Sequence, residues 1–413
     1  MKRTVTVEEA KLLWQNEIEH FPHAVMTLPV EDARGYVLAD TLVAMQDIPS
    51  FSRSAVDGYA VPFKEECTNY TVVGLVGAGT VWNKPVHQGE AIRIMTGAPI
   101  PEGCDTVFMQ EFCEIVENSK QGDKDRIIIR GHQERGQHII IQGEECVKGT
   151  SILEPNVRLE PEHIAMAVSL GYTELKVYAP LKALLLTSGR EIAEPGTTLT
   201  TGKVFNSNRY LLKGLLEQEG IIDIKTYHVS DDPELFEKEL VELEGLFADV
   251  DIVISTGGVS VGLFDSLPLL YERLGARTLY TRIAMRPGAA TMGAVRKKDK
   301  QQFIFGLSGN PAAAYQNWLL MAKPVIRMLQ GLKEPCYDSV EAELTTDFNK
   351  KSPVDRYVQG IVRYVEGKAQ FTPSEQLSGS AVIGLHQMNA LLKLPKGSEG
   401  LSAGSMVQVY KVK

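Results

Sequence analysis

The chain has 413 residues, of which 44% are hydrophobic, 7% aromatic and 23% charged, and its net charge is −9 at pH 7. This length corresponds to roughly two to four domains and lets the chain bury a core without disulfides or a structural metal. The negative charge disfavours nucleic-acid binding through phosphate neutralisation and a polybasic membrane anchor.

The cysteine pattern and the absence of long apolar runs indicate where the protein resides. The five cysteines form no CxxC pair and have no metal-ligand spacing, so we interpret them as free thiols in a reducing cytoplasm. No run of about 18 apolar residues is present, and the N-terminus is charged where a signal peptide would be apolar. We therefore expect a cytoplasmic protein that contacts neither a membrane nor nucleic acid.

Short strand-like segments and one long helix make up the first part of the chain. A helix is expected over 7–21, within an N-terminal α/β part that comprises residues 1–50 and 141–178. Residues 51–140 contain short apolar runs broken by glycine, proline and charged turns, which predicts an inserted all-β module.

The middle of the chain, residues 179–331, alternates strands with helices. Strands are predicted near 181–187, 224–229, 251–255 and 303–307. Asn206, Ser207 or Asn208 would cap the first helix. This alternation predicts a doubly wound parallel sheet within a multidomain α/β protein, and residues 332–413 predict a small C-terminal β-barrel.

Three of the predicted strands end in small, glycine-rich polar loops. Because ligands bind at the carboxyl ends of the strands in doubly wound sheets, we expect these loops to meet in space. Their candidate ligand-binding residues are Ser188, Gly189, Thr256, Gly257, Gly258, Ser260, Gly262, Gly309, Asn310 and Pro311.

The loop TGGVSVG, residues 256–262, is the strongest local signal for a ligand. Its glycines allow close backbone approach, and its N–H groups and two hydroxyls can hold a phosphate. A structural turn would explain the glycines but not the hydroxyls. The loop is neither a Walker A motif nor a dinucleotide fingerprint, which disfavours NTP hydrolysis and nicotinamide chemistry.

Charged residues of both signs follow the same strands. Glu191 and Asp265 are candidate magnesium ligands beside a phosphate, although either acid could simply stabilise a helix N-terminus. Arg282 and Arg286, the latter followed by Pro287, are candidate anion-binding residues, although a basic strand face is usually just solvated.

Six strings spread over the sequence give it a family resemblance. They are SAVDGYAV (54–61), RIMTGAPIPEGCDTVFMQE (93–111), NSNRY (206–210), VSDDPE (229–234), VISTGGVSVG (253–262) and GLSGNPAAA (306–314). The chain resembles the molybdopterin molybdenumtransferases, the MoeA/gephyrin E-domain family. The resemblance implies a homodimer of elongated, four-part subunits with a MogA-like central part and an N-terminal part that links and dimerises. It also implies Mg²⁺-dependent insertion of molybdate into adenylylated molybdopterin, which releases AMP and forms the molybdenum cofactor.

The resemblance also assigns residue roles. It makes Glu191 and Asp265 the magnesium-associated acids, and a molybdopterin adenylyltransferase the upstream partner. Asp57 and Thr96, which local chemistry leaves undecided, match residues lent to the cleft by the neighbouring subunit. The remaining matches are Asp231 or Asp232 for an acidic pair, Arg282 and Arg286 for two functional lysines, and Arg356, Ser378 and Ser380 for molybdate contacts.

Several positions depart from the family pattern. Arg190 replaces an acid, Ala289-Ala290 replaces a Lys-Pro pair, Ser308 replaces a proline, and the GED-type motif is Gly143-Glu144-Glu145. These departures keep two alternatives open: a non-catalytic molybdopterin carrier or scaffold, and a transferase tuned to tungstate.

Overall fold

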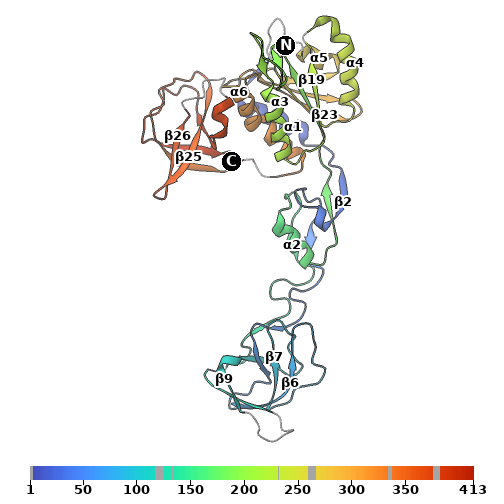
Figure 1. Cartoon of the computed structure of the whole chain (residues 1–413), viewed down its shortest axis with the longest axis vertical. Helices are drawn as coiled ribbons and strands as arrows, with labels where there is room; N and C mark the ends of the chain where they lie inside the picture. Colours follow the sequence, from blue (N-terminus) through green and yellow to red (C-terminus); the bar gives the residue numbers. More distant parts are fainter. Residues whose placement is uncertain are drawn as a thin grey trace.

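The computed structural model describes residues 3–116, 125–132, 134–230, 232–258, 267–333, 337–374 and 382–413. Figure 1 shows an elongated molecule: the central α/β unit and the C-terminal barrel lie side by side at one end, and a β module lies at the other end. A small linking unit that carries α2 (Pro161–Ser169) and β2 (Val25–Pro29) joins them.

The central unit contains a six-stranded sheet with the order β17-β14-β18-β23-β22-β19. The first four strands are parallel, as predicted: β17 (Ile224–Val229), β14 (Ala183–Ser188), β18 (Ile252–Thr256) and β23 (Gln301–Leu307). Two further strands, β22 (Met292–Lys297) and β19 (Ala276–Tyr280), extend one edge through antiparallel pairs. The predicted doubly wound sheet is therefore confirmed, with an antiparallel extension that the sequence analysis did not foresee.

Helices cover both faces of this sheet because its parallel strands are apolar on both sides. Leu184 and Leu186 pack with α4 (Phe236–Phe247) and α5 (Leu267–Arg273). Leu185 and Ile254 face α3 (Ser207–Gln218) and the helical run of α6 (Pro311–Asn317), a π-helical turn (Trp318–Ala322) and α7 (Lys323–Leu329). Each loop at the carboxyl edge therefore follows a strand that helices cover on both faces.

The N-terminal helix α1 (Val7–Ile18) packs on the central sheet. Its Thr6 cap and Glu9 form a capping box. Trp14 is fully buried against Phe303 and Phe305, and its indole N–H donates to the Tyr280 hydroxyl at 3.1 Å. The adjacent β1 (Thr4–Val5) pairs with β20 (Arg282–Ile283).

From the central unit, the chain runs out to the β module and back along paired strands. The antiparallel pairs are β2 with β13 (Glu174–Tyr178), β3 (Leu42–Val43) with β12 (Ser151–Leu153), and β4 (Arg53–Ser54) with β11 (Ile139–Ile140). We call the linking unit and the β module together the arm.

The β module holds a six-stranded sheet with the order β8-β5-β7-β6-β10-β9. Its strands are β5 (Gly58–Val61), β6 (Asn69–Val76), β7 (Glu90–Ile94), β8 (Thr106–Met109), β9 (Cys113–Val116) and β10 (Arg126–Ile129). Gly58 starts β5, where an added Cβ would overlap the carbonyl oxygen of Phe108. This glycine is therefore required by close strand packing rather than by a turn.

The C-terminal strands close into a five-stranded barrel, as predicted. They are β24 (Ser339–Leu344), β25 (Asp355–Val365), β26 (Lys368–Pro373), β27 (Ala390–Leu394) and β28 (Met406–Lys411), and pairing of β25 with β27 closes the ring. The central unit adds β21 (Met285–Arg286) to β25. Across the described ranges, no helix is both long and apolar enough to cross a membrane.

Candidate functional site

A cavity of about 330 Å³ opens at the carboxyl edge of the central sheet, where the three glycine-rich loops meet. Its lining includes residues from the ends of β14, β18 and β23, from the start of α3, and from the short pair β15 (Ile192–Ala193) and β16 (Val204–Phe205). Of the residues predicted to bind a ligand, those that line it are Ser188, Glu191, Thr256, Gly257, Gly309, Asn310 and Pro311. The predicted meeting of the loops is confirmed.

Glycine allows the loops to touch. Gly257 has a φ of +79°, and a Cβ added there would lie 2.6 Å from the carbonyl oxygen of Ser188. A Cβ at Gly309 would lie 3.4 Å from the Cα of Gly257, so the third loop packs directly on the second. Gly258 and Gly189 also have positive φ values and lie in the same cluster. Side chains at these positions would push the loops apart.

Two buried polar atoms in the cavity wall have no hydrogen-bond partner in the described structure. They are the Oγ of Ser188 and the Oδ1 of Asn208, whose residues are 3% and 8% exposed. Asn206 caps α3 by accepting from the N–H of Arg209, and the amide of Asn208 donates to the carbonyl oxygen of Gly309 at 2.8 Å. Because unpaired buried polar atoms are costly, these two are suited to receive a ligand.

The predicted magnesium acids are only partly described. Glu191 lines the cavity, and its carboxylate lies over Gly189. Asp265, Ser260 and Gly262 lie outside the described residues, so the pairing of Asp265 with Glu191 stays a prediction. In the part of the chain that is described, no group of three or more His, Cys, Asp or Glu side chains could hold a metal.

Two buried amides of α6, which the sequence analysis missed, connect the arginine-bearing turn to the third loop. The amide of Asn317 donates to Gly288 at 2.8 Å, and its oxygen accepts from the N–H of Ser308 at 3.1 Å. Gln316 donates to the carbonyl oxygen of Pro287 at 3.0 Å. Both side chains are fully buried. Two amide residues at the end of an otherwise apolar helical stretch were the signal from which the sequence analysis could have identified them.

Two of the predicted anion-binding arginines stand side by side. Arg286 and Arg356 are register partners in the parallel pair of β21 and β25. The Nε of Arg356 is buried without a hydrogen-bond partner, and burial, followed by the charge of Arg286, lowers the pKa of Arg356. Arg282 is exposed on β20 and does not line the cavity, while Ser378 and Ser380 lie outside the described residues. Because guanidinium groups suit oxyanions, Arg286 and Arg356 stay candidate anion-binding residues.

Asp57 and Thr96 form one unit in the β module, beside the β4–β11 pair through which the chain enters it: the N–H of Gly97 donates to the carbonyl oxygen of Ser54. The module as a whole lies at the opposite end of the molecule from the central unit (Figure 1). The Asp57 carboxylate accepts from the N–H of Thr96 at 2.7 Å and from its hydroxyl at 2.8 Å. These hydrogen bonds, the backbone bond first, lower the pKa of Asp57. The result is an exposed, ionised carboxylate in a fixed orientation.

The remaining predicted residues occupy more ordinary positions. Asp232 caps a short 3-10 turn (Pro233–Leu235), where its carboxylate accepts from the N–H of Glu234 at 3.1 Å, and Asp231 lies outside the described residues. Arg190 is exposed and does not line the cavity, and its carbonyl oxygen accepts from Lys203.

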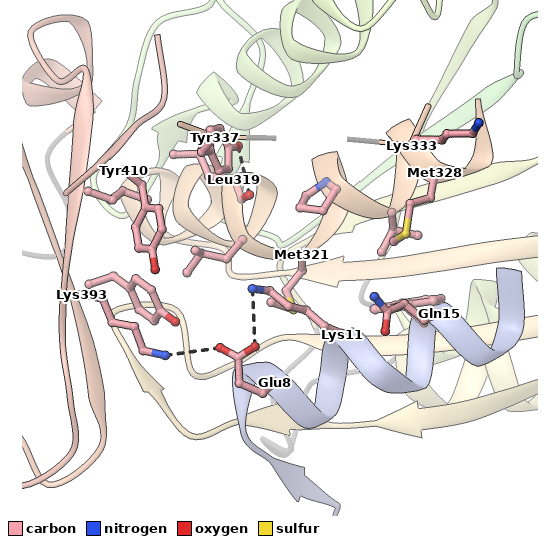
Figure 2. A pocket seen from close by; sticks show the side chains of 16 residues that line it. Glu8, Lys11, Gln15, Leu319, Met321, Met328, Lys333, Tyr337, Lys393 and Tyr410 are labelled. Atoms are coloured by element: carbon pink, nitrogen blue, oxygen red, sulfur yellow. Dashed lines mark hydrogen bonds and ion pairs between the residues drawn. The ribbon is translucent and has the colours of Figure 1, made fainter. Parts of the chain in front are cut away.

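A second cavity, of about 460 Å³, lies between α1, the helical run 318–329 and the barrel (Figure 2). Its floor is apolar, and Glu8 at its rim pairs with Lys11 and Lys393. None of the residues predicted from the sequence lines it.

Known proteins with similar sequences cover nearly the whole chain. The family descriptions that match are "MoeA N-terminal region (domain I and II)" over residues 5–171, "Probable molybdopterin binding domain" over 185–328 and "MoeA C-terminal region (domain IV)" over 341–412. A molybdopterin molybdenumtransferase of Staphylococcus epidermidis is 34% identical, over 99% of this chain and 96% of that protein. The enzyme of the same name from Bacillus subtilis is also 34% identical, over 93% and 89%.

The fold agrees with these sequence matches. The crystal structure of a molybdopterin biosynthesis MoeA protein from Pyrococcus horikoshii superposes with a TM-score of 0.79 at 25% identity and covers both chains completely. The chain therefore belongs to the molybdopterin molybdenumtransferase family of enzymes.

Proposed function

We propose that this chain inserts molybdate into adenylylated molybdopterin and releases AMP. The observation that carries the proposal is the single cavity formed by the loops after β14, β18 and β23, in a chain whose relatives are named for molybdenum transfer to molybdopterin. A cavity of this size is within the range of small-molecule sites.

In this proposal, the loops hold the phosphate groups of the substrate. Glycine at positions 257 and 309 lets backbone approach the ligand without steric hindrance. The unpaired oxygens of Ser188 and Asn208 accept hydrogen bonds from substrate N–H or O–H groups. Breaking the phosphoanhydride bond to AMP leaves charge on the departing phosphate, and a fixed, partly buried site stabilises that charge without reorganisation.

The donor atoms in the cavity wall suit a hard cation. Glu191 supplies a carboxylate, and the buried hydroxyl of Ser188, which has no hydrogen-bond partner among the described residues, supplies a neutral oxygen to the ion as an alternative to the substrate contact. We propose that these residues help to hold Mg²⁺, with Asp265 as the second acid. When bound, the ion would neutralise phosphate charge.

Molybdate, as a substrate, would be held by the adjacent guanidinium groups of Arg286 and Arg356. Their positive charges attract the oxyanion, and the unpaired Nε–H of Arg356 offers a directed donor. Asn317 and Gln316 fix the turn that follows Arg286, so the anion site keeps its place beside the third loop.

The position of Asp57 and Thr96 leads us to propose that the working enzyme is a homodimer. Because these residues belong to the β module, which lies at the opposite end of the molecule from the central unit, they can complete a cleft only in a neighbouring subunit. We further propose a molybdopterin adenylyltransferase as the source of the substrate. Free thiols at Cys67, Cys104, Cys113 and Cys146 support a reducing, cytoplasmic location.

Purified protein, adenylylated molybdopterin, molybdate and Mg²⁺ provide the test. We expect AMP release that depends on both molybdate and Mg²⁺ and that falls by about 100-fold or more in Glu191→Ala. Glu217→Ala is the matched control, because this exposed acid on α3 pairs only with Lys213 among the ion pairs of the described residues and does not line the cavity. No AMP release by wild-type protein at saturating molybdate would refute the proposal.

A second candidate function, a non-catalytic molybdopterin carrier, is favoured by one departure from the family. Ala289 and Ala290 replace a Lys-Pro pair immediately after the arginine turn. A carrier would bind the pterin tightly without turnover, and Ala289→Lys would then create AMP release. An unchanged rate in Ala289→Lys, with an active wild-type enzyme, would eliminate this candidate.

A further inference from the structure

The arm and the central unit have separate hydrophobic cores. The core of the linking unit contains Leu38, Leu159 and Leu175, and none of its buried residues belongs to the core around Trp14 and the central sheet. A continuous core therefore does not fix the angle between these two parts. The contacts at their junction must do so.

The arm itself is braced along its length. Its outgoing and returning strands pair three times, through β2 with β13, β3 with β12 and β4 with β11. Because each pair is antiparallel and hydrogen-bonded, the two chain segments cannot move independently. A small change of angle at the base would consequently displace the β module, and with it Asp57 and Thr96.

Two side chains of the linking unit reach across the junction. Tyr178 packs against Gly331, where an added Cβ would lie 2.5 Å from its ring, and Arg158 makes polar contacts. Arg158 donates to the carbonyl oxygens of Gly35 and Glu219 at 3.1 and 3.3 Å and to the Oε1 of Gln330 at 2.9 Å. Gly35 belongs to the linking unit, whereas Glu219 and Gln330 end α3 and α7 of the central unit. The guanidinium therefore connects the arm to two helix ends at once.

The two residues of the central unit that accept from Arg158, Glu219 and Gln330, are nearly buried. Glu219 is 8% exposed, and its carboxylate lies 3.8 Å from Arg158, 3.2 Å from Lys323 and 3.8 Å from Arg327. Gln330 also donates to the carbonyl oxygen of Glu219 at 2.6 Å. Burial lowers the pKa of the Arg158 guanidinium, against the opposing effect of Glu219. Only Arg158 in this cluster of four charges comes from the arm.

We infer that Arg158 is a positioning residue for the transferase reaction. By clamping the base of the arm to the ends of α3 and α7, it sets the angle at which Asp57 and Thr96 are presented to the neighbouring subunit's cavity. This inference rests on the proposed function, because it assumes that the arm completes a cleft in the partner.

The first experiment measures the shape of the full-length protein by small-angle X-ray scattering. Arg158→Ala should broaden the distribution of interatomic distances, since the arm is no longer held at one angle. Arg327→Ala is the matched control, because it removes a guanidinium from the same carboxylate without touching the arm. In both variants Glu219 keeps a cationic partner, Lys323, so the central unit should remain folded.

The second experiment is steady-state AMP release. In Arg158→Ala, kcat should fall about ten- to a hundredfold, because misplaced reacting groups cost that much. KM for the adenylylated substrate should stay within about twofold, since its cavity lies on the intact central unit. Arg158→Lys should recover part of kcat, and Arg327→Ala should match wild type.

These outcomes test the positioning role of Arg158 separately from the proposed transferase function. Scattering and kcat that are both unchanged in Arg158→Ala would overturn the clamp, even with an active enzyme. If wild-type protein releases no AMP, the proposed function fails and scattering alone decides whether Arg158 holds the arm. Mixed dimers of Asp57→Ala and Glu191→Ala subunits should recover activity at one of two sites, whereas mixed dimers of Asp57→Ala and Arg158→Ala should not.

Discussion

The cavity of the central unit and the Asp57–Thr96 pair of the β module are assembled in different ways. The cavity joins three loops that are well separated in the chain, and the loops touch because Gly257 and Gly309 have no side chains. The pair in the β module is held instead by two hydrogen bonds between Asp57, which precedes β5, and Thr96, which follows the antiparallel β7.

This difference indicates which changes each region should tolerate. The cavity depends on steric fit, so a larger side chain within it should sharply reduce activity. A change of charge at its edge should reduce activity less. The pair depends on hydrogen bonds to an exposed carboxylate, so its failure should appear mainly as altered pH dependence.

The largest effect is expected from Gly58→Ala in the β module. An added methyl group would overlap the carbonyl oxygen of Phe108 on the paired strand, and neither backbone can move without breaking the sheet. We expect the module to lose about 3 kcal/mol of stability. Calorimetry should show a lower transition for the module alone, and a shift of every transition together would contradict the separation of the cores.

Gly257→Ala should come next, and it should act on the central unit. Its φ of +79° and the 2.6 Å approach to Ser188 would together cost about 1–3 kcal/mol. AMP release should fall by about 100-fold as the loops separate. Gly202→Ala is the control, because Gly202 has a φ of +88° but open space around it. Equal loss of activity in both variants would show that the strain of a positive φ, rather than the contact with Ser188, reduces activity.

Arg356→Ala tests the anion site between the central unit and the barrel. Loss of a charge-assisted contact should raise the apparent KM for molybdate about tenfold with little change in stability. Arg363→Ala, on the same strand but exposed and paired with Gln370, should leave KM unchanged. An equal change in the KM for molybdate in both variants would show that the anion does not bind at Arg356.

The smallest effect is expected from Thr96→Val in the β module. The hydroxyl of Thr96 helps to lower the pKa of Asp57, so its removal should raise that pKa toward the ordinary value. Protonation would then begin at a higher pH, and the acidic limb of the rate profile should move upward in pH, with little change near neutrality. Thr96→Ser should retain the wild-type profile.

Much of the central unit could be predicted from its sequence. Apolar runs that end in Ser188-Gly189, Thr256-Gly257 and Leu307 are typical of parallel strands, and the carboxyl edge of a parallel sheet is a known binding position. The cap at Asn206 was one of three candidates that the sequence offered, because asparagine and serine favour that position. The cap at Asn310 was not predicted.

Contacts that depend on strand order could not be predicted. Asp57 and Thr96 are 39 residues apart in the chain and meet only because β5 pairs with β7. Arg286 and Arg356 meet because a short strand of the central unit joins the barrel. Neither pairing is encoded in a local pattern. The antiparallel β22 is a different case: it forms a local hairpin with β23, in which Lys297 lies opposite Gln301, and the sequence analysis missed it.

The β4–β11 pair at the neck of the module has a practical consequence. Since Arg53 and Ser54 lie opposite Ile140 and Ile139, the chain leaves and re-enters at one spot. Residues 55–138 therefore form a self-contained insertion, and a two-residue hairpin turn could replace them. An engineer could graft a foreign domain there and keep the remainder of the scaffold intact.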